Sequence, residues 1–242
     1  MRPVVNLLRL RGVSILQQLR LEEALLRADP GNWCILNDGS ATAAIVLGIS
    51  GKSGELVHEE AAAAAGLPLI KRFSGGGTVV VDADTLFATI IMNAAALPDV
   101  ECYPRPVMRW SELFYTPIFA PYGDFSLREH DYAFGERKFG GNAQAITKQR
   151  WLHHTSLLWD FRDVHMRLLK HPSKAPEYRA GRNHLEFVCR LRDYLPAREL
   201  VFDGTAQALR TAGFAIKEVG LEEAGAALDR DYLRSTRVLE PG

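Results

Sequence analysis

Residues 71–78 could form an anion-binding turn. They read Lys-Arg-Phe-Ser-Gly-Gly-Gly-Thr, so Arg72 stands shortly before three consecutive glycines. Glycines permit positive φ and leave no side chain between backbone N–H groups and a ligand, so successive amides can converge on an anion. A flexible hairpin turn is the alternative, because glycine also marks turns for conformational reasons. The β-branched run at 79–81 predicts a strand, which is typical of neither a Walker loop nor a dinucleotide fingerprint.

A second unusual segment places a lysine and two histidines on strand-like sequence. Residues 135–144 contain Lys138 in the run Gly-Glu-Arg-Lys-Phe-Gly-Gly-Asn-Ala-Gln, and residues 151–158 read Trp-Leu-His-His-Thr-Ser-Leu-Leu. Alternation along a strand puts His154 and Ser156 on one face and their neighbours His153 and Thr155 on the other. Only one histidine can therefore face a pocket.

The whole chain has balanced charge and few cysteines. Its 242 residues carry 29 basic and 29 acidic side chains, so no global field draws it to nucleic acid or to a membrane surface. Cys34, Cys102 and Cys189 are scattered, which argues against a zinc site or a disulfide framework and for a reducing compartment. No membrane span or secretory signal is visible. We expect a cytoplasmic protein, with mitochondrial import as the alternative because the first 21 residues are arginine-rich and lack acids.

The elements that must position these residues are mostly strands. Strands are expected at 4–10, 32–37, 44–49, 67–72, 79–81, 86–92, 131–134, 138–146 and 151–159, and helices at 15–28, 55–65, 104–119 and 205–212. Ser14 can cap the first helix. The strands at 32–37 and 44–49 are expected to form a hairpin. The acidic, alanine-rich end beyond 216 is expected to be loosely held.

Together the two segments resemble the catalytic domain of the lipoate-protein ligase A family. The shared features are an R-x-SGGG turn before a strand, a G-x-K-hydrophobic-x-G-x-A strand and an HH-x-[TS]-LL strand. The resemblance runs from about residue 3 to 196 and includes a Leu-x-x-Glu-Glu helix at 19–23. It implies a catalytic domain at 1–200 with a helical extension at 201–242. The implied fold is α/β (α+β), biotin/lipoate protein ligase-like, with a mixed, largely antiparallel sheet and packed helices.

The resemblance also implies an ATP-dependent ligase that forms lipoyl-AMP and transfers the lipoyl group to a lysine. The implied acceptors are lipoyl domains of 2-oxoacid dehydrogenases or the glycine cleavage H protein, and the acid is lipoate or octanoate. Such a reaction gathers negative charge at a carboxylate and an α-phosphate, so it needs fixed cations and N–H donors rather than a protein nucleophile. Magnesium is implied only through ATP, and no metal site built by the protein is expected.

The family motifs assign roles to particular residues. The catalytic residue is Lys138, which would touch both the acyl carboxylate and the phosphate. The nucleotide-binding residues are Arg72, Gly75, Gly76, Gly77, Thr78, Val79, Val80, Asp131 and Lys138, and the acyl-binding residues are Lys138, Ala143, His154 and Ser156. Val79, Val81, Ile90 and Leu158 are candidates for the apolar acyl slot. Structural alternatives remain: a hydrogen-bonded strand pair for His154 and Ser156, and an ordinary strand acid for Asp131. Glu22 and Glu23 are either exposed surface carboxylates or, as the family motif implies, include one that anchors a loop near the site.

Some positions depart from the family pattern. Where the family shows His-Asp, then Gly-Asn, then Asn-Asp, this chain has Val81-Asp82, Asp84-Thr85 and His130-Asp131. The separate C-terminal domain of bacterial members is not expected within 242 residues, so activation could need a partner or follow a single-domain route. The main alternative is a lipoyl or octanoyl transferase that takes a pre-activated acyl donor. A cysteine-dependent transferase, a biotin ligase, which would need a basic GRGRxGR-type loop, and a non-catalytic binding module are less favoured alternatives.

Overall fold

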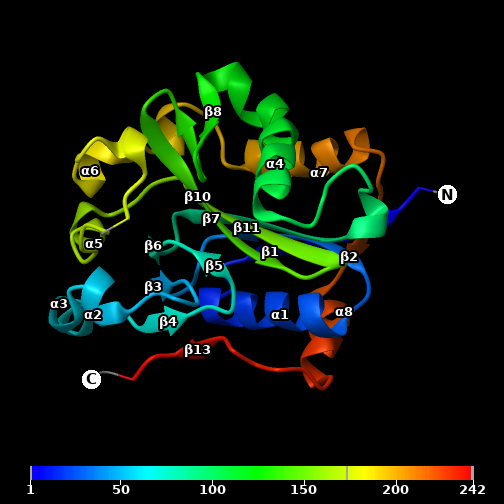
Figure 1. The fold of residues 1–242 in the computed structure, drawn as a ribbon, viewed down its shortest axis with the longest axis horizontal. Helices are drawn as coiled ribbons and strands as arrows, with labels where there is room; N and C mark the ends of the chain where they lie inside the picture. Colours follow the sequence, from blue (N-terminus) through cyan, green and yellow to red (C-terminus); the bar gives the residue numbers. More distant parts are fainter. Residues whose placement is uncertain (1, 173, 241–242) are drawn as a thin grey trace.

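A nine-stranded mixed sheet forms the centre of the protein (Figure 1). The computed structural model describes residues 2–172 and 174–240. The strands of this sheet are β1 (Val4–Arg11), β2 (Asn32–Asp38), β5 (Gly75–Gly76), β7 (Thr85–Asn93), β8 (Phe125–Arg128), β9 (Asp131–Phe134), β10 (Arg137–Ile146), β11 (Arg150–Leu158) and β12 (Ala215–Val219). Their order is β12-β1-β2-β7-β11-β10-β9-β8, with β5 added to β10. Only β1 pairs in parallel, with β12 and β2, so the predicted mixed, largely antiparallel sheet is confirmed.

Helices cover both faces of this sheet (Figure 1). One face packs against α4 (Pro104–Phe119) and α7 (Glu199–Thr211), and the other against α1 (Ile15–Ala28) and the short α8 (Leu221–Gly225). An aromatic core that includes Tyr115, Phe119 and Trp151 fills the α4 side. Helix α1 begins where predicted, because the Ser14 hydroxyl accepts a hydrogen bond from the backbone N–H of Gln17.

A smaller four-stranded sheet lies beside the main one. It has the order β13-β4-β3-β6, formed by β3 (Ala44–Leu47), β4 (Leu69–Lys71), β6 (Val79–Val81) and β13 (Arg237–Val238). Two short helices, α2 (Ser53–Leu56) and α3 (Glu59–Ala64), replace the single helix predicted at 55–65. The break falls at Val57, which makes a β-bridge to Leu169, while the N–H of His58 bonds to the carbonyl of Leu168.

The predicted hairpin between 32–37 and 44–49 is wrong. Both edges of β2 are already occupied, by β1 and β7, so β3 joins the smaller sheet instead. The chain crosses between sheets at Ser40, whose N–H bonds to the carbonyl of Asp82 and whose hydroxyl accepts from the N–H of Ile15. Gly39 and Ser40 therefore make a crossover and not a hairpin turn.

The chain end is held in place, contrary to the expectation of a loose tail. Strand β13 pairs antiparallel with β4, and the Glu23 carboxylate accepts hydrogen bonds from the backbone N–H groups of Ser235 and Thr236, each at 2.9 Å. Residues beyond 200 contribute α7, β12, α8 and β13. Two further helices, α5 (Asp163–Met166) and α6 (His184–Phe187), lie in the long segment after β11. Within residues 2–172 and 174–240, no helix is long and apolar enough to cross a membrane.

Candidate functional site

The glycine turn and the lysine strand, which are distant in sequence, are paired in the structure. Strand β5 aligns antiparallel with β10, so that Gly76 faces Ala143 and Gly75 faces Gln144. Gly76 has φ +129°, a conformation that favours glycine. A Cβ atom there would lie 2.7 Å from Arg72 Nη2 and 2.8 Å from the Asn142 carbonyl oxygen. Glycine at this position therefore lets the turn lie directly against β10.

The side chain of Arg72 bonds to the backbone of the glycine turn. It is buried, its Nη2 donates to the Gly77 carbonyl at 2.7 Å, and its Nη1 lies 3.4 Å from the Val46 carbonyl. Burial lowers the pKa of Arg72 to about 10, and the nearby Glu22 carboxylate opposes this shift. The guanidinium thus fixes the backbone of the turn and places a positive charge next to it.

Several polar atoms around the turn have no protein partner. Among the described residues, Arg72 Nε, Ser74 Oγ and Thr78 Oγ1 are buried without a hydrogen bond. Buried polar atoms are usually hydrogen-bonded, so three together mark a place where a ligand could supply partners. A Cβ at Gly77 would meet nothing within 4 Å, so this residue borders open space. Val79 and Val80 follow in β6, which pairs with β3 and lies at the edge of the smaller sheet as the described residues form it.

Lys138 and Asp131 form the charged centre of the site. Lys138 Nζ lies 2.8 Å from Asp131 Oδ1, with the two side chains 22% and 12% exposed. The other carboxylate oxygen, Oδ2, accepts from the Tyr178 hydroxyl at 3.1 Å. The pairing of β10 with β9 shifts in register between Lys138 and Gly140. Because Gly141 lacks a side chain, the lysine can fold back over it: a Cβ there would be 3.3 Å from Nζ.

The predicted acyl-binding residues share this face. Ala143 pairs with His154, and Gly141 pairs with Ser156, whose Oγ lies 3.6 Å from the Gly141 Cβ position. His153 points to the opposite face, where its Nε2 lies 3.0 Å from the Tyr132 hydroxyl, so the predicted alternation is confirmed. Ile90 pairs with His153 and belongs to the core on the α4 side. Its prediction as a residue of the acyl slot is therefore wrong.

Glu22 holds His154 in position. Its carboxylate lies 3.0 Å from His154 Nδ1 and accepts from Thr89 Oγ1 at 2.7 Å and from Gln18 Nε2 at 2.8 Å. The exposed-carboxylate interpretation of Glu22 and Glu23 is wrong, because both residues are buried. Glu22 contacts side chains of β7 and β11, whereas Glu23 bonds to the backbone at 235–236. The family motif Leu-x-x-Glu-Glu was the sequence signal for this role.

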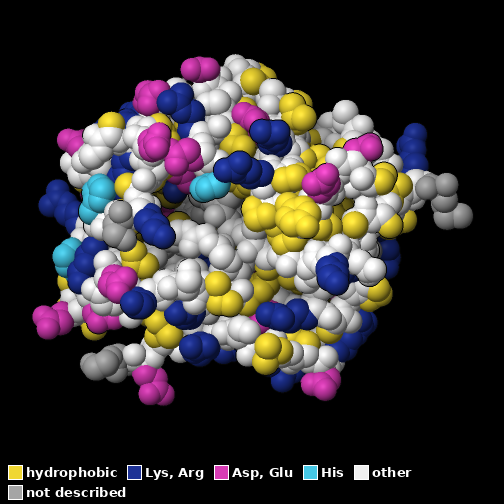
Figure 2. Space-filling model, in the orientation of Figure 1, with side chains coloured by type: hydrophobic (Ala, Val, Ile, Leu, Met, Phe, Trp, Pro, Cys, Tyr) yellow, Lys and Arg dark blue, Asp and Glu magenta, His cyan; other side chains and the backbone are white. Residues whose placement is uncertain are grey.

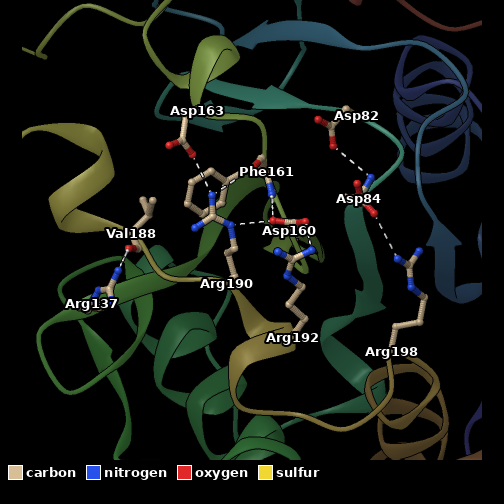
Figure 3. Close-up of polar contacts among 10 residues, drawn as sticks. All are labelled: Asp82, Asp84, Arg137, Asp160, Phe161, Asp163, Val188, Arg190, Arg192 and Arg198. Atoms are coloured by element: carbon tan, nitrogen blue, oxygen red, sulfur yellow. Dashed lines mark hydrogen bonds and ion pairs between the residues drawn. The ribbon is translucent and has the colours of Figure 1, made fainter.

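The segment between β11 and α7 lies next to the lysine and is fastened by a charged cluster (Figure 3). Asp160, just after β11, accepts from Arg190 Nε at 2.7 Å and also pairs with Arg192. The Cys189 N–H bonds to the Lys138 carbonyl at 2.8 Å, and Arg137 Nη2 bonds to the Val188 carbonyl at 2.8 Å. The same view shows the salt bridge between Arg198 and Asp84.

This segment supplies site residues that the sequence motifs did not indicate. Tyr178 contacts Asp131 directly, and burial and that carboxylate raise the pKa of Tyr178. Burial, then the charges of Arg179 and Lys138, lower the pKa of His184 to about 4. The available sequence signal was one tyrosine followed by Arg179, Arg182 and His184, whose spacing has no regular period.

The site opens on one face of the molecule. Figure 2 shows a hollow near the centre of this face, over the region where β5 meets β10 in Figure 1, with mostly uncharged atoms inside it and basic side chains around it. Among the described residues, no group of three or more His, Cys, Asp or Glu side chains is placed to hold a metal ion. The arrangement offers cations and N–H donors, which are the groups that stabilise negative charge developing in a reaction.

The sheet, with its glycine turn paired to a lysine-bearing strand, has the fold of the lipoate protein ligases. Residues 14–213 match the family model of the lipoyl protein ligase A/B catalytic domain, and the chain belongs to this family.

Solved structures agree with this assignment at the level of the fold. A bi-partite lipoate protein ligase studied with its E2 lipoyl domain, from Thermoplasma acidophilum, superimposes with a TM-score of 0.74 at 17% identity, over 93% of this chain and 90% of that one. A lipoate-protein ligase A bound with ATP gives a TM-score of 0.71 at 17% identity, over 94% and 93%.

A curated relative is the inactive lipoate–protein ligase 2 of Plasmodium falciparum. It is 28% identical over 194 residues, which are 65% of this chain and 49% of the relative. The chain thus spans about half the length of that curated relative.

Proposed function

We propose that this protein is an ATP-dependent lipoate-protein ligase. It would convert lipoate and ATP to lipoyl-AMP and pyrophosphate, and then pass the lipoyl group to a lysine of a lipoyl-domain protein. The observation that carries this proposal is the pairing of β5 with β10, which brings the glycine turn and Lys138 to one face. The ATP bound to one structural relative, and the E2 lipoyl domain studied with another, support the choice of nucleotide and acceptor.

In the first step, a carboxylate oxygen of lipoate attacks the α-phosphorus of ATP, and the bond to the pyrophosphate oxygen breaks. Negative charge gathers on the phosphate oxygens. Lys138 Nζ and the amides near Gly77 are the donors proposed to stabilise that charge. Asp131 holds the ammonium group in place at 2.8 Å before the substrate arrives. We propose that magnesium enters bound to ATP and that Asp131 is the carboxylate next to it.

In the second step, the uncharged amine of the acceptor lysine attacks the acyl carbonyl carbon. A C–N bond forms, the C–O bond to AMP breaks, AMP leaves with that electron pair, and the amine releases a proton to solvent. Lys138 is proposed to stay with the phosphate as it becomes the leaving group. His154, held by Glu22, and Ser156 are proposed to line the acyl side of the pocket.

A route through an acyl-cysteine is disfavoured by the state of the three cysteines. Burial raises the pKa of the Cys34 thiol to about 12 and that of Cys189 to about 11, and it also raises the pKa of Cys102. A thiol becomes a nucleophile through its thiolate, so raised pKa values argue against this chemistry. Cys189 also packs in the aromatic core with Phe139, although its backbone is bonded to Lys138.

The second candidate is a transferase that takes a pre-activated acyl donor. The observation that favours it is the departure from the family pattern at Val81 and Thr85, where nucleotide contacts are expected. The test is pyrophosphate release from ATP with lipoate or octanoate, with and without a lipoyl domain. Lipoate-dependent release would support the ligase. Transfer from synthetic lipoyl-adenylate without such release would support the transferase, and loss of both reactions in folded protein would contradict both proposals.

A further inference from the structure

Arg179 is a buried cation that has no role in the reaction steps proposed above. It ends the 3₁₀ turn Glu177–Arg179 and is 3% exposed. Its Nε donates to the Arg182 carbonyl at 2.8 Å, and its guanidinium lies over the Phe187 ring at 5.1 Å. Among the described residues its Nη2 is buried without a hydrogen-bond partner. Such an orphan charged donor is costly unless a ligand bonds to it.

The neighbourhood of Arg179 is that of the catalytic lysine. Its sequence neighbour Tyr178 donates to Asp131, the carboxylate paired with Lys138. Burial lowers the pKa of Arg179, and the Asp131 charge opposes that shift. His184 lies in the field of both Arg179 and Lys138. The two cations therefore belong to one electrostatic site.

Both carboxylate oxygens of Asp131 already have hydrogen-bond or ion-pair partners in the protein. Lys138 is paired with one oxygen of Asp131, and the other oxygen is taken by the Tyr178 hydroxyl. Asp131 thus already has two donors of its own, while the outer nitrogen Nη2 of Arg179 has none among the described residues. An incoming anion with a free oxygen is the natural partner for it, because a guanidinium bonds oxyanions in a fixed fork.

The position of Arg179 is set before any ligand binds. The charged cluster around Asp160 joins the two ends of the segment that carries Arg179 (Figure 3). The backbone N–H of Cys189 also bonds this segment to the Lys138 carbonyl. The Nε bond to Arg182 fixes the plane of the guanidinium. A donor held in this way loses little freedom on binding.

We propose that Arg179 binds an oxyanion of the acyl donor, either the phosphate of the adenylate or the carboxylate of the free acid. The proposal rests on the ligase function proposed above and adds a second cation to Lys138. Arg182 is the matched control. It too lies over Phe187, at 5.4 Å, and donates to loop carbonyls, those of Arg179 at 3.0 Å and Tyr178 at 2.7 Å, but it is not among the residues with an orphan nitrogen.

The test compares charged ligands with their uncharged counterparts by isothermal titration calorimetry. AMP is paired with adenosine, and lipoate with lipoamide, for the wild type and for Arg179→Gln, Arg179→Lys and Arg182→Gln. For Arg179→Gln we expect about a 10- to 100-fold loss of affinity for AMP or for lipoate, the size of one charge-assisted hydrogen bond. Adenosine and lipoamide should change by less than about twofold, because neither offers the oxyanion. A selective loss with AMP identifies the phosphate, and one with lipoate identifies the carboxylate.

Arg182→Gln should change the affinities for the charged and the uncharged ligand of each pair by the same factor. If Arg179→Gln shows equal losses within each pair, or no loss, the assignment of Arg179 is overturned. If thermal unfolding shows that Arg179→Gln does not fold, Arg179→Lys decides: a selective loss of about threefold or more is expected because lysine lacks the fork, and unchanged binding of both anions overturns the role. Failure of the wild type to bind any of the four ligands would overturn the ligase proposal itself, and this inference with it.

Discussion

The ion pair between Lys138 and Asp131 positions the lysine side chain but adds little to the stability of the fold. Both side chains retain some exposure, and pairs of this kind contribute roughly 0–1 kcal/mol to stability. A substrate anion can therefore take the lysine from Asp131 at small cost. This suits the role proposed for Lys138, in which its ammonium group follows negative charge from a carboxylate to a phosphate.

Replacement of Lys138 by alanine should separate activity from folding. We expect acyl transfer to a lipoyl domain to fall by about 100- to 1,000-fold, because a donor aimed at developing charge is lost. The free energy of unfolding should change by less than about 1 kcal/mol, since the pair is partly exposed. Transfer rate and urea denaturation measure the two effects. Lys148→Ala, at an exposed position after β10, is the control, and near-normal transfer by Lys138→Ala would contradict the role.

At the residue scale, the sequence indicated the groups that lie on regular strands. Lys138, His154 and Ser156 could be placed on one face because alternation along β10 and β11 is regular. Glu22 was misread as exposed, because its burial depends on Thr89 and His154, which come from distant strands. Arg179 was missed because an irregular segment has no period from which a direction can be read.

The glycine turn is best understood as an element, since Gly76 and Gly77 have different surroundings. Gly76→Ala should be destabilising by about 1–3 kcal/mol, because a Cβ would strain the positive φ and press on Arg72 and β10. Gly77→Ala should leave stability within about 0.5 kcal/mol, as its Cβ would enter open space. Chemical denaturation measures both.

ATP binding by Gly77→Ala tests whether the open space next to Gly77 holds the nucleotide. If ATP approaches the turn closely, Gly77→Ala should weaken ATP binding by about tenfold, the effect of a methyl group between amide and phosphate. The residues that bind the nucleotide would then include an amide of this turn. Unchanged ATP affinity in a fully folded Gly77→Ala protein would place the nucleotide elsewhere.

Helix α1 uses two adjacent carboxylates for two different tasks. Glu22 faces His154, while Glu23 accepts from the backbone of the chain end at 235–236. Glu23→Ala should release that end, and hydrogen exchange at Leu239, whose N–H bonds to the Leu69 carbonyl, should speed up by about tenfold or more. Exchange in β10 should not change. Unaltered protection at Leu239 would show that β13 holds without Glu23.

At the element scale, the positions of most strands and helices could be predicted from the sequence pattern. The strand with which each strand pairs could not. The helix at 104–119 and the strand at 131–134 have the predicted bounds. The pairing of β3 with β4 and β6, rather than with β2, depends on which strand edges remain free after the main sheet forms. That information lies in the assembled sheet and not in any local segment.

At the scale of the whole molecule, His153 should make stability depend on pH. It is fully buried, and burial, with a smaller effect of His154, lowers its pKa to about 3. Between the unfolded pKa of about 6.5 and the folded value, the unfolded chain binds the proton and the folded protein does not. The stability contributed by the neutral ring is therefore present above about pH 6.5 and is lost as pH falls, by up to about 1.4 kcal/mol per pH unit.

Urea denaturation from pH 7 to pH 4 measures this dependence. Other groups titrate in the same range, so the comparison with His153→Gln isolates the histidine: the variant should have a shallower slope. His130→Gln, at an exposed position, should keep the wild-type slope. Equal slopes for the wild type and His153→Gln would contradict the assignment.

Each sheet is completed by a strand from late in the described chain, which pairs with a strand from much earlier in the sequence. Val4 pairs with Ala215, and Lys71 pairs with Arg237. Pairings across such long sequence separations close large loops, and the chain entropy of closing them must be overcome before the contacts form. The relative contact order is thereby raised, and we expect refolding to be slow. The edges next to β1 and β4 should gain protection from exchange after the central strands β7, β10 and β11.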